Sequence, residues 1–173
     1  DPATGASLGD LFDFLNVPDE RHRVLLLAWL VTAMWPRGPY PILVLHGGQG
    51  SAKSTLATFL KQLIDPAGPL LRTAPRDERD LVIAASNSKV VTFDNLSSIH
   101  GWLSDALCRI ATGGGLATRT LYSDDDEAVF NVQCPIILNG IEELASRADL
   151  LDRSVILAMP PIGPSDRRDE AQL

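Results

Sequence analysis

The stretch from residue 41 to residue 64 limits the fold of this chain more than any other. It reads PILVLH, then GGQGS, then AKSTLATFLKQLI, which predicts a buried strand, a glycine-rich turn and a helix. The apolar residues that fall on one side of this helix are Leu56, Leu60, Leu63 and Ile64. A buried strand that leads directly into an amphipathic helix is typical of α/β folds with a parallel sheet, so we expect that fold class.

The glycine-rich turn has the composition of a phosphate-binding loop. Glycines before a helix leave unpaired backbone N–H groups at the positive end of the helix dipole, and these suit an anionic phosphate chain. Counted from Gly47, the stretch follows GxxxxGK[ST], in which Lys53 would reach the β- and γ-phosphates and the Ser54 hydroxyl would bind Mg²⁺. The predicted nucleotide-binding residues are Gly47, Gly48, Gln49, Gly50, Ser51, Ala52, Lys53, Ser54 and Thr55. The alternative is a glycine-rich turn that contains a lysine by chance.

One position departs from this pattern, because Ala52 stands where the pattern has a glycine directly before the lysine. A β-carbon there is costly only if the backbone needs a positive φ angle, in which case it costs about 1–2 kcal/mol. We place Ala52 in the first turn of the helix, where φ is negative and alanine is the better helix former. Phosphate binding is therefore expected to tolerate the alanine.

Two further apolar strands end in polar residues that suit the same site. The run VVTFD ends in Asp94, and PIILN ends in Asn139. The carboxyl ends of parallel strands meet at one edge of the sheet, where ligands bind. The Asp94 carboxylate would hold Mg²⁺ there, and the Asn139 amide would orient an attacking water. Taken separately, Asp94 could cap the next helix and Asn139 with Gly140 could form a turn.

The remaining segments alternate between predicted helices and strands. Residues 1–40 form an N-terminal helical appendage, in which the apolar run from Val24 to Trp35 predicts a buried helix. Residues 41–162 form the core, which we expect to be a three-layer α/β/α arrangement with a mostly parallel sheet. Residues 163–173 are a charged tail. Between the second and third buried strands, TRTLY and AVFNV predict a hairpin around a polar tip.

Composition excludes several kinds of protein. The net charge of −7 argues against a protein that coats nucleic acid over its whole surface, so any contact with DNA must be local. Cys108 and Cys134 lie far apart without a CxxC pair, so the sequence indicates neither a zinc site nor a disulfide framework, and a reducing cytoplasm fits. The longest apolar run is shorter than the roughly 20 residues that a membrane span needs. We therefore expect no membrane partner.

Together these motifs resemble those of the P-loop ATPases of the AAA+ and superfamily 3 helicase type, especially the helicase part of phage and plasmid primase-helicases. GGQGSAKST is similar to their Walker A motif, VVTFDN to Walker B, and PIILN to sensor 1 or motif C. The likeness runs from about Pro41 to Pro161. The resemblance implies a P-loop NTPase fold, ATP and Mg²⁺ as cofactors, and ATP hydrolysis in DNA replication.

The segment RADLLDRSVIL resembles the part of these ATPases that carries an arginine finger. By that resemblance Arg153, with Arg147 as the other candidate, would reach the neighbouring subunit's site and stabilise charge on the transferred phosphoryl group. A site shared between subunits implies a ring of copies of this chain, expected to be hexameric. The alternative for Arg153 is an ion pair with Asp149 or Asp152 in its own helix.

Two features depart from the helicase pattern. Many such ATPases have a catalytic glutamate directly after the Walker B aspartate, whereas this chain has Asn95, which cannot accept a proton as a base. Asn95 could still position water, or Glu142 or Glu143 could substitute for the missing acid. We therefore expect an ATPase, in which ATP binding is the firmer expectation and slow hydrolysis is the alternative that Asn95 raises.

The second departure is the tip of the predicted hairpin, which is basic in the helicases and contacts DNA. Here the tip runs from Ser123 to Glu127 and carries four carboxylates, which would repel phosphates. Arg119 and Tyr122 on the hairpin arm could still contact single-stranded DNA, the tyrosine by stacking on a base. A solvated turn is the alternative for the acidic run.

Three functions follow from these patterns. The first is an ATP-driven ring motor for DNA unwinding or translocation in a phage- or plasmid-type replication protein. The second is a nucleotide-dependent switch with weak or no hydrolysis and a protein partner, which Asn95 and the acidic tip favour. The third, a small-molecule kinase, fits less well because such kinases carry an arginine-bearing lid and no sensor asparagine.

Overall fold

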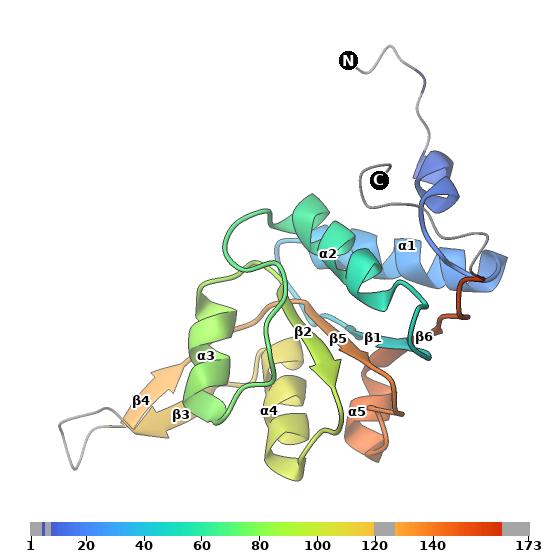
Figure 1. Ribbon diagram of the computed structural model, residues 1–173. Helices are drawn as coiled ribbons and strands as arrows, with labels where there is room; N and C mark the ends of the chain where they lie inside the picture. Colours follow the sequence, from blue (N-terminus) through green and yellow to red (C-terminus); the bar gives the residue numbers. More distant parts are fainter. Residues whose placement is uncertain (1–4, 6–7, 120–126, 164–173) are drawn as a thin grey trace.

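The computed structural model describes residues 5, 8–119 and 127–163 of the chain (Figure 1). Its elements are η2 (Leu8–Asp13), α1 (Glu20–Met34), β1 (Ile42–His46), α2 (Lys53–Ile64), α3 (Glu78–Ser86), β2 (Val91–Leu96), α4 (Gly101–Thr112), β3 (Leu116–Arg119), β4 (Glu127–Phe130), β5 (Ile136–Gly140), α5 (Ala148–Asp152) and β6 (Ser154–Ala158). Strands and helices alternate through most of the chain, which matches the predicted α/β class.

A four-stranded sheet forms the centre of the protein. Its strands are in the order β2-β5-β1-β6, and every pair of neighbours is parallel. At the free edge of β2, Arg72 forms an isolated parallel bridge with Phe93. Strands β1 and β5 are almost wholly buried, which explains why their sequences are continuous apolar runs rather than alternating ones.

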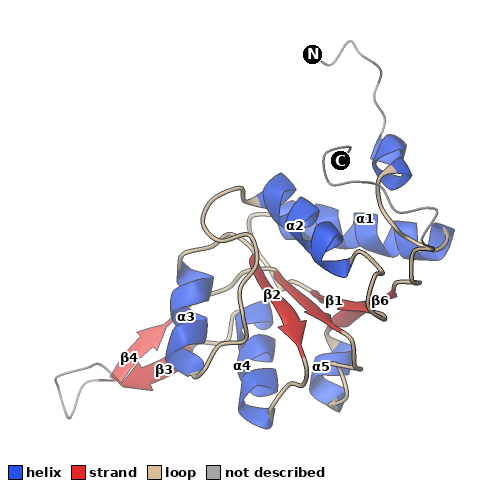
Figure 2. Cartoon of the chain, in the orientation of Figure 1, coloured by secondary structure: helices blue, strands red, loops and turns tan. Residues whose placement is uncertain are grey.

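Helices cover both faces of this sheet (Figure 2). Along β1, Leu43 and Leu45 pack with α1 and α2 on one face, whereas Ile42 and Val44 pack with α3, α4 and α5 on the other. The period of two along a strand therefore divides the core into two apolar clusters. The predicted three-layer α/β/α arrangement is confirmed, whereas the division of the chain into three segments stays a prediction.

The helix predicted over the apolar run is only half buried. Asp19 caps α1 by accepting a hydrogen bond from the His22 N–H, and Pro36 follows its end. The buried residues of α1 are Leu26, Trp29, Leu30 and Ala33, and its exposed apolar residues are Val24, Val31 and Met34, with Trp35 directly after the helix. A helix that is apolar on all sides keeps one apolar face exposed to solvent when the core covers only the other side.

Strands β3 and β4 pair as an antiparallel hairpin away from the main sheet (Figure 1). The hairpin prediction is confirmed, with Arg119 opposite Glu127, so Glu127 belongs to the strand and not to the tip. Residues 120–126 lie outside the described residues. In the part of the chain that the structure describes, no helix is long and apolar enough to cross a membrane.

Candidate nucleotide-binding site

The glycine-rich loop connects β1 to α2 and forms one wall of a cavity of about 510 Å³. The cavity is lined by Gln49, Gly50, Ser51, Ala52, Lys53, Ser54, Thr55, Asp94, Asn95, Asn139, Gly140 and Ile141. The loop therefore faces the carboxyl ends of β2 and β5, as the spacing of the motifs predicted. Gly47 lies instead against the segment after β6, because a β-carbon there would fall 2.4 Å from the Met159 carbonyl oxygen.

Lys53 is the first residue of α2 and is only 8% exposed. Its ammonium donates hydrogen bonds to the carbonyl oxygens of Gly47 at 2.7 Å and Gly48 at 2.8 Å, and to Ser51 Oγ at 3.2 Å. Burial lowers the pKa of Lys53, and the charge of Asp94 opposes that shift. Among the described residues no carboxylate lies within ion-pair distance of this ammonium. Its charge is therefore solvated by neutral groups and stays available to an anion.

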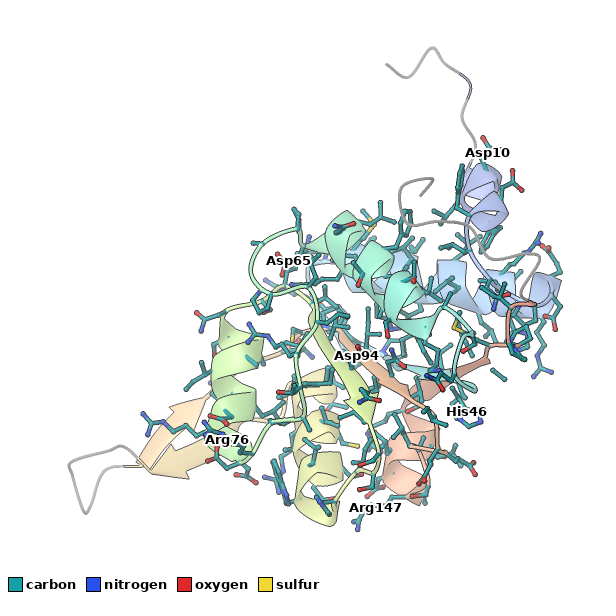
Figure 3. The ribbon with its side chains drawn as sticks, in the orientation of Figure 1. Asp10, His46, Asp65, Arg76, Asp94 and Arg147 are labelled. Atoms are coloured by element: carbon teal, nitrogen blue, oxygen red, sulfur yellow. The ribbon has the colours of Figure 1, made fainter. Side chains whose placement is uncertain are left out.

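Three polar side chains meet beside Lys53, one from each of α2, β2 and β5. Ser54 Oγ donates to Asp94 Oδ1 at 2.9 Å, and Asn139 Nδ2 donates to Ser54 Oγ at 3.0 Å. Asn139 Nδ2 also donates to Asp94 Oδ1. Asp94, labelled in Figure 3, is half-buried, whereas Asn139 is fully buried. A hydroxyl and a carboxylate oxygen this close together are hard oxygen donors of the kind that Mg²⁺ prefers.

The expected backbone of Ala52 is wrong. The residue has φ 57° and ψ 29°, in the left-handed region, and it caps α2 from outside instead of lying in its first turn. A left-handed residue directly before a helix turns successive N–H groups toward a common point, which is the arrangement that binds anions. The β-carbon therefore costs about 1–2 kcal/mol, and a glycine at this position would have a conformational advantage.

Asn95 is the other residue with strained backbone at the cavity. It has φ 55°, and together with Ala52 it makes up the non-glycine residues with positive φ in the described ranges. The β2–β5 register shifts between Phe93 and Leu96, so Asn95 lies in a bulge, and asparagine is among the residues that best tolerate this conformation. Backbone strain that collects around one cavity is typical of functional sites.

Neither acid proposed as a substitute for the missing glutamate reaches the cavity. Glu142 and Glu143 are exposed and do not line it. Asp94 is therefore the one carboxylate among the residues that line the cavity.

The alternative of an Asn-Gly turn after the third buried strand is wrong. Asn139 and Gly140 both lie within β5, and Gly140 is paired with His46 of β1. A β-carbon on Gly140 would fall 2.6 Å from the Leu96 carbonyl oxygen. The glycine is needed for the close approach of two strands, and that approach holds Asn139 at the sheet edge.

Comparison with known proteins identifies the family. The sequence model of the actinomycete integrative conjugative element replication proteins matches residues 8–173. The chain belongs to this family. It is a replication protein with a helicase-like P-loop fold. No curated protein matches its sequence.

Solved structures confirm the fold of this replication protein. A crystal structure of JCV helicase bound to an acetamide compound matches it with a TM-score of 0.56 at 13% identity, over 83% of this chain and 42% of the helicase chain. The apo NrS-1 C-terminal region gives 0.55 at 15% identity, over 88% and 35%. The RuvB P216G mutant of Thermotoga maritima gives 0.53 at 18% identity, over 83% and 46%. The chain spans less than half the length of each, and the likeness shows a shared P-loop NTPase fold.

The two candidate finger arginines of the replication protein flank α5 and lie outside the cavity. Arg147 precedes α5, is 50% exposed, and donates to Asp105 Oδ1 on α4 at 3.2 Å (Figure 3). Arg153 follows α5, is 40% exposed, and donates to the Asp149 carbonyl oxygen at 2.8 Å. The ion pair with Asp149 that the sequence left open is present at 3.6 Å. An exposed pair of this kind contributes about 0–1 kcal/mol, so it leaves Arg153 free to exchange partners.

The replication protein's predicted DNA contacts are placed only in part. Arg119 ends β3, and Tyr122 lies outside the described residues. Their role in binding single-stranded DNA stays a prediction.

Sequence reasoning missed three residues around the site. Gly140 and Ile141 line the cavity, and their position directly after Asn139 was a signal that could have indicated them. Asn16 hydrogen-bonds to the loop from the N-terminal segment, 35 positions before Ser51, and no motif marks it.

Proposed function

We propose that this replication protein binds ATP with Mg²⁺ and hydrolyses it as the motor domain of a DNA replication helicase that works as a ring. The observation that carries the proposal is the convergence of Lys53, Ser54, Asp94 and Asn139 at one cavity of a P-loop fold. These four side chains come from three separate motifs, and each has a chemistry that phosphoryl transfer uses.

Binding would use groups that are already in position. The N–H groups of the loop and the Lys53 ammonium would hold the β- and γ-phosphates, since that ammonium has no carboxylate partner among the described residues. Ser54 Oγ and Asp94 Oδ1 would hold Mg²⁺, which supplies neutralisation of phosphate charge when bound. The hydrogen bond between Ser54 and Asp94 would then open.

Hydrolysis would depend on amides rather than on a glutamate base. Asn139 is fixed by its bonds to Ser54 and Asp94, so its amide would orient a water at the γ-phosphate. Asn95 lines the cavity but cannot take the proton from that water. We therefore expect turnover that is slower than in ATPases with a glutamate at this position.

The arginine would come from a neighbouring copy of the chain. Lys53 is the one cation among the residues that line the cavity, and Arg147 and Arg153 both lie outside it. Phosphoryl transfer places negative charge on oxygens that a second cation commonly stabilises. Exposed arginines at both ends of α5 suit a head-to-tail interface, which closes into a ring of copies.

A second candidate function is a switch that binds ATP, hydrolyses it weakly and acts on a protein partner. Asp94 as the single lining carboxylate favours it, because no general base is in place.

Mixing two inactive variants tests the shared site. Lys53→Ala removes the lysine that would bind phosphate in a subunit's own site. Arg153→Ala removes the arginine that the subunit would contribute to its neighbour's site. Each variant alone should be inactive, and an equal mixture should recover about a quarter of wild-type turnover, because one interface in four then joins two intact halves. Arg147→Ala in place of Arg153→Ala decides between the two arginines. A mixture with no recovery for either arginine would sink the shared site.

Stimulation by DNA separates the motor from the switch. For a motor, steady-state ATP turnover of the wild type should rise with single-stranded DNA and with protein concentration. Tight ATP binding with negligible turnover under all these conditions would instead establish the switch.

A further inference from the structure

Two segments outside the sheet form hydrogen bonds to the phosphate loop without lining the cavity. Asn16 Nδ2 donates to the Ser51 carbonyl oxygen at 3.1 Å and to the Pro160 carbonyl oxygen at 2.7 Å. The Ile162 N–H donates to the Gly50 carbonyl oxygen at 3.0 Å. Neither Asn16 nor Ile162 lines the cavity. Figure 1 shows the segment after β6 beside the segment that joins η2 to α1.

These bonds fix the direction of two successive peptide groups in the loop. In a trans peptide the N–H points opposite to the C=O of the same plane. Since the carbonyls of Gly50 and Ser51 are bound by groups that do not line the cavity, the N–H groups of Ser51 and Ala52 point away from those groups, and both residues line the cavity. Two consecutive N–H groups that point the same way form an anion-binding nest, and the left-handed φ of Ala52 completes it.

The segment that carries Asn16 is itself anchored in the core. Phe12 and Val17 on either side of it are buried in the apolar cluster that also contains Leu45 and Met159. The Arg23 guanidinium of α1 lies 5.3 Å from the centre of the Phe12 ring. Asn16 is thus a polar side chain in a segment that apolar residues hold in the core. Its amide hydrogen bonds link this segment to the phosphate loop and to the segment after β6.

We propose that Asn16 is a positioning residue for nucleotide binding, which sets the anion-binding direction of the Ala52 N–H group through the Ser51 carbonyl. The proposal rests on the proposed ATP-binding function. Without Asn16 the Ser51–Ala52 peptide plane is free to rotate, and only the fraction of molecules with the N–H turned inward binds phosphate. The apparent affinity for the nucleotide is therefore the intrinsic affinity multiplied by that fraction. The N-terminal helical segment thereby affects nucleotide binding, although Asn16 does not line the cavity.

An isosteric substitution tests this role against a matched control. Asn16→Asp keeps the shape of the side chain and replaces both donor hydrogens with an acceptor that repels the Ser51 and Pro160 carbonyls. Asn87→Asp makes the same change at an exposed asparagine whose amide also donates to a carbonyl oxygen, that of Ile83 at 2.9 Å, away from the cavity. Thermal melts report the loss of stability, which should be similar in the two variants. Calorimetric titration reports the Kd for Mg-ATP and for magnesium tripolyphosphate.

We expect Asn16→Asp to raise both Kd values by the same factor, about tenfold, and Asn87→Asp to leave them unchanged. Ile162→Pro removes the N–H that fixes the neighbouring peptide plane and changes no helix or strand, so it gives a second, independent measurement. It should raise both Kd values as well. If wild type binds Mg-ATP and the folded Asn16→Asp variant binds it equally tightly, the positioning role of Asn16 is overturned while ATP binding stands. If wild type binds neither ligand, the proposed function fails and the positioning role falls with it.

Discussion

The two ends of α2 carry buried lysines that are treated in opposite ways. Lys53 at the start of the helix is 8% exposed, and Lys61 in its last turn is 1% exposed. Burial of a lysine costs free energy unless its charge is compensated. What compensates each charge therefore distinguishes a structural lysine from one that is available for a ligand.

The charge of Lys61 is neutralised inside the protein. Its ammonium lies 2.6 Å from Asp65 Oδ2 and donates to the Val90 carbonyl oxygen at 3.0 Å. Asp65 in turn accepts hydrogen bonds from the N–H groups of Lys89 and Ala67. This closed network ties the end of α2 to the residues that lead into β2.

The charge of Lys53 is held only by dipoles. Two carbonyl oxygens and one hydroxyl accept its hydrogens, and the nearest motif carboxylate, Asp94, is bound to Ser54 and Asn139 instead. An unneutralised ammonium at the wall of a cavity is a site for an anion. Both lysines are buried, so burial does not separate them, whereas the missing counter-charge makes Lys53 the candidate for anion binding.

Replacing the lysine with methionine at each end of α2 should affect different properties. We call the Lys61 end closed, because its charge is neutralised inside the protein, and the Lys53 end open. The larger effect is expected at the closed end. Lys61→Met keeps most of the length and apolar contact of the side chain but leaves the Asp65 carboxylate buried without its partner. Removal of one member of a buried ion pair costs about 3–5 kcal/mol of unfolding free energy. Urea denaturation followed by circular dichroism measures the loss. A loss below about 1 kcal/mol, in the range of an exposed pair, would show that this end is open to water.

The pH dependence of that loss identifies Asp65 as its source. Burial raises the pKa of Asp65, but hydrogen bonds from Lys61 and the Lys89 N–H and the Lys61 charge outweigh it, so the pKa lies below the usual 3.8. A carboxyl with a lowered pKa stabilises the fold above its unfolded value and loses that contribution as pH falls through its folded value. The difference in unfolding free energy between wild type and Lys61→Met should therefore narrow as pH falls below 3.8.

At the open end, Lys53→Met should spare the fold and weaken nucleotide binding. A hydrogen bond between charged groups contributes about 1.5–3 kcal/mol, so the Kd for Mg-ATP should rise about 100-fold. The unfolding free energy should change by less than about 1 kcal/mol, because removal of a buried charge without a counter-ion offsets the lost hydrogen bonds. Calorimetric titration and urea denaturation on one preparation test both statements. Stability lost together with binding would contradict the distinction between the two lysines.

Sequence patterns predicted the elements and motif residues at the open end of α2 but not the backbone of Ala52, and they predicted nothing of the closed end. The order strand, loop, helix and the strand-terminal Asp94 and Asn139 follow from periodicities that recur within short windows. Nothing in the run TFLKQLIDP distinguishes Lys61 from an ordinary surface lysine, because its burial depends on Val90, which arrives 29 residues later. The exposed face of α1 has the same origin, since an all-apolar helix does not say which side the core will cover.

Backbone angles at the site were equally out of reach of pattern reasoning. We expected Ala52 to lie within the helix, whereas it has a left-handed φ in a loop to which Asn16 and Ile162 donate hydrogen bonds. Hydrogen bonds between segments so distant in sequence have no local signature. The same holds for the bulge in which Asn95 has a positive φ.

The smallest expected effect concerns strain, which is present at the open end and absent from the closed one. Ala52 precedes α2 at φ 57°, whereas Asp65 after its end has φ −154°. Relief of a left-handed alanine amounts to about 1–2 kcal/mol, and the extra freedom of an unfolded glycine offsets about 0.5–1 kcal/mol of it. Ala52→Gly should therefore raise the unfolding free energy by about 0.5–1 kcal/mol.

Ala28→Gly is the matched control, because it places a glycine at an exposed position inside α1, where φ is helical. That substitution should lower the unfolding free energy by about 1 kcal/mol, so the two variants should shift urea midpoints in opposite directions. A lower unfolding free energy in both variants would mean that the loop does not hold Ala52 in the left-handed region. The nest formed by the Ser51 and Ala52 N–H groups would then not exist before a ligand arrives, and the contrast between a strained, open end and a relaxed, closed end of α2 would reduce to their charges alone.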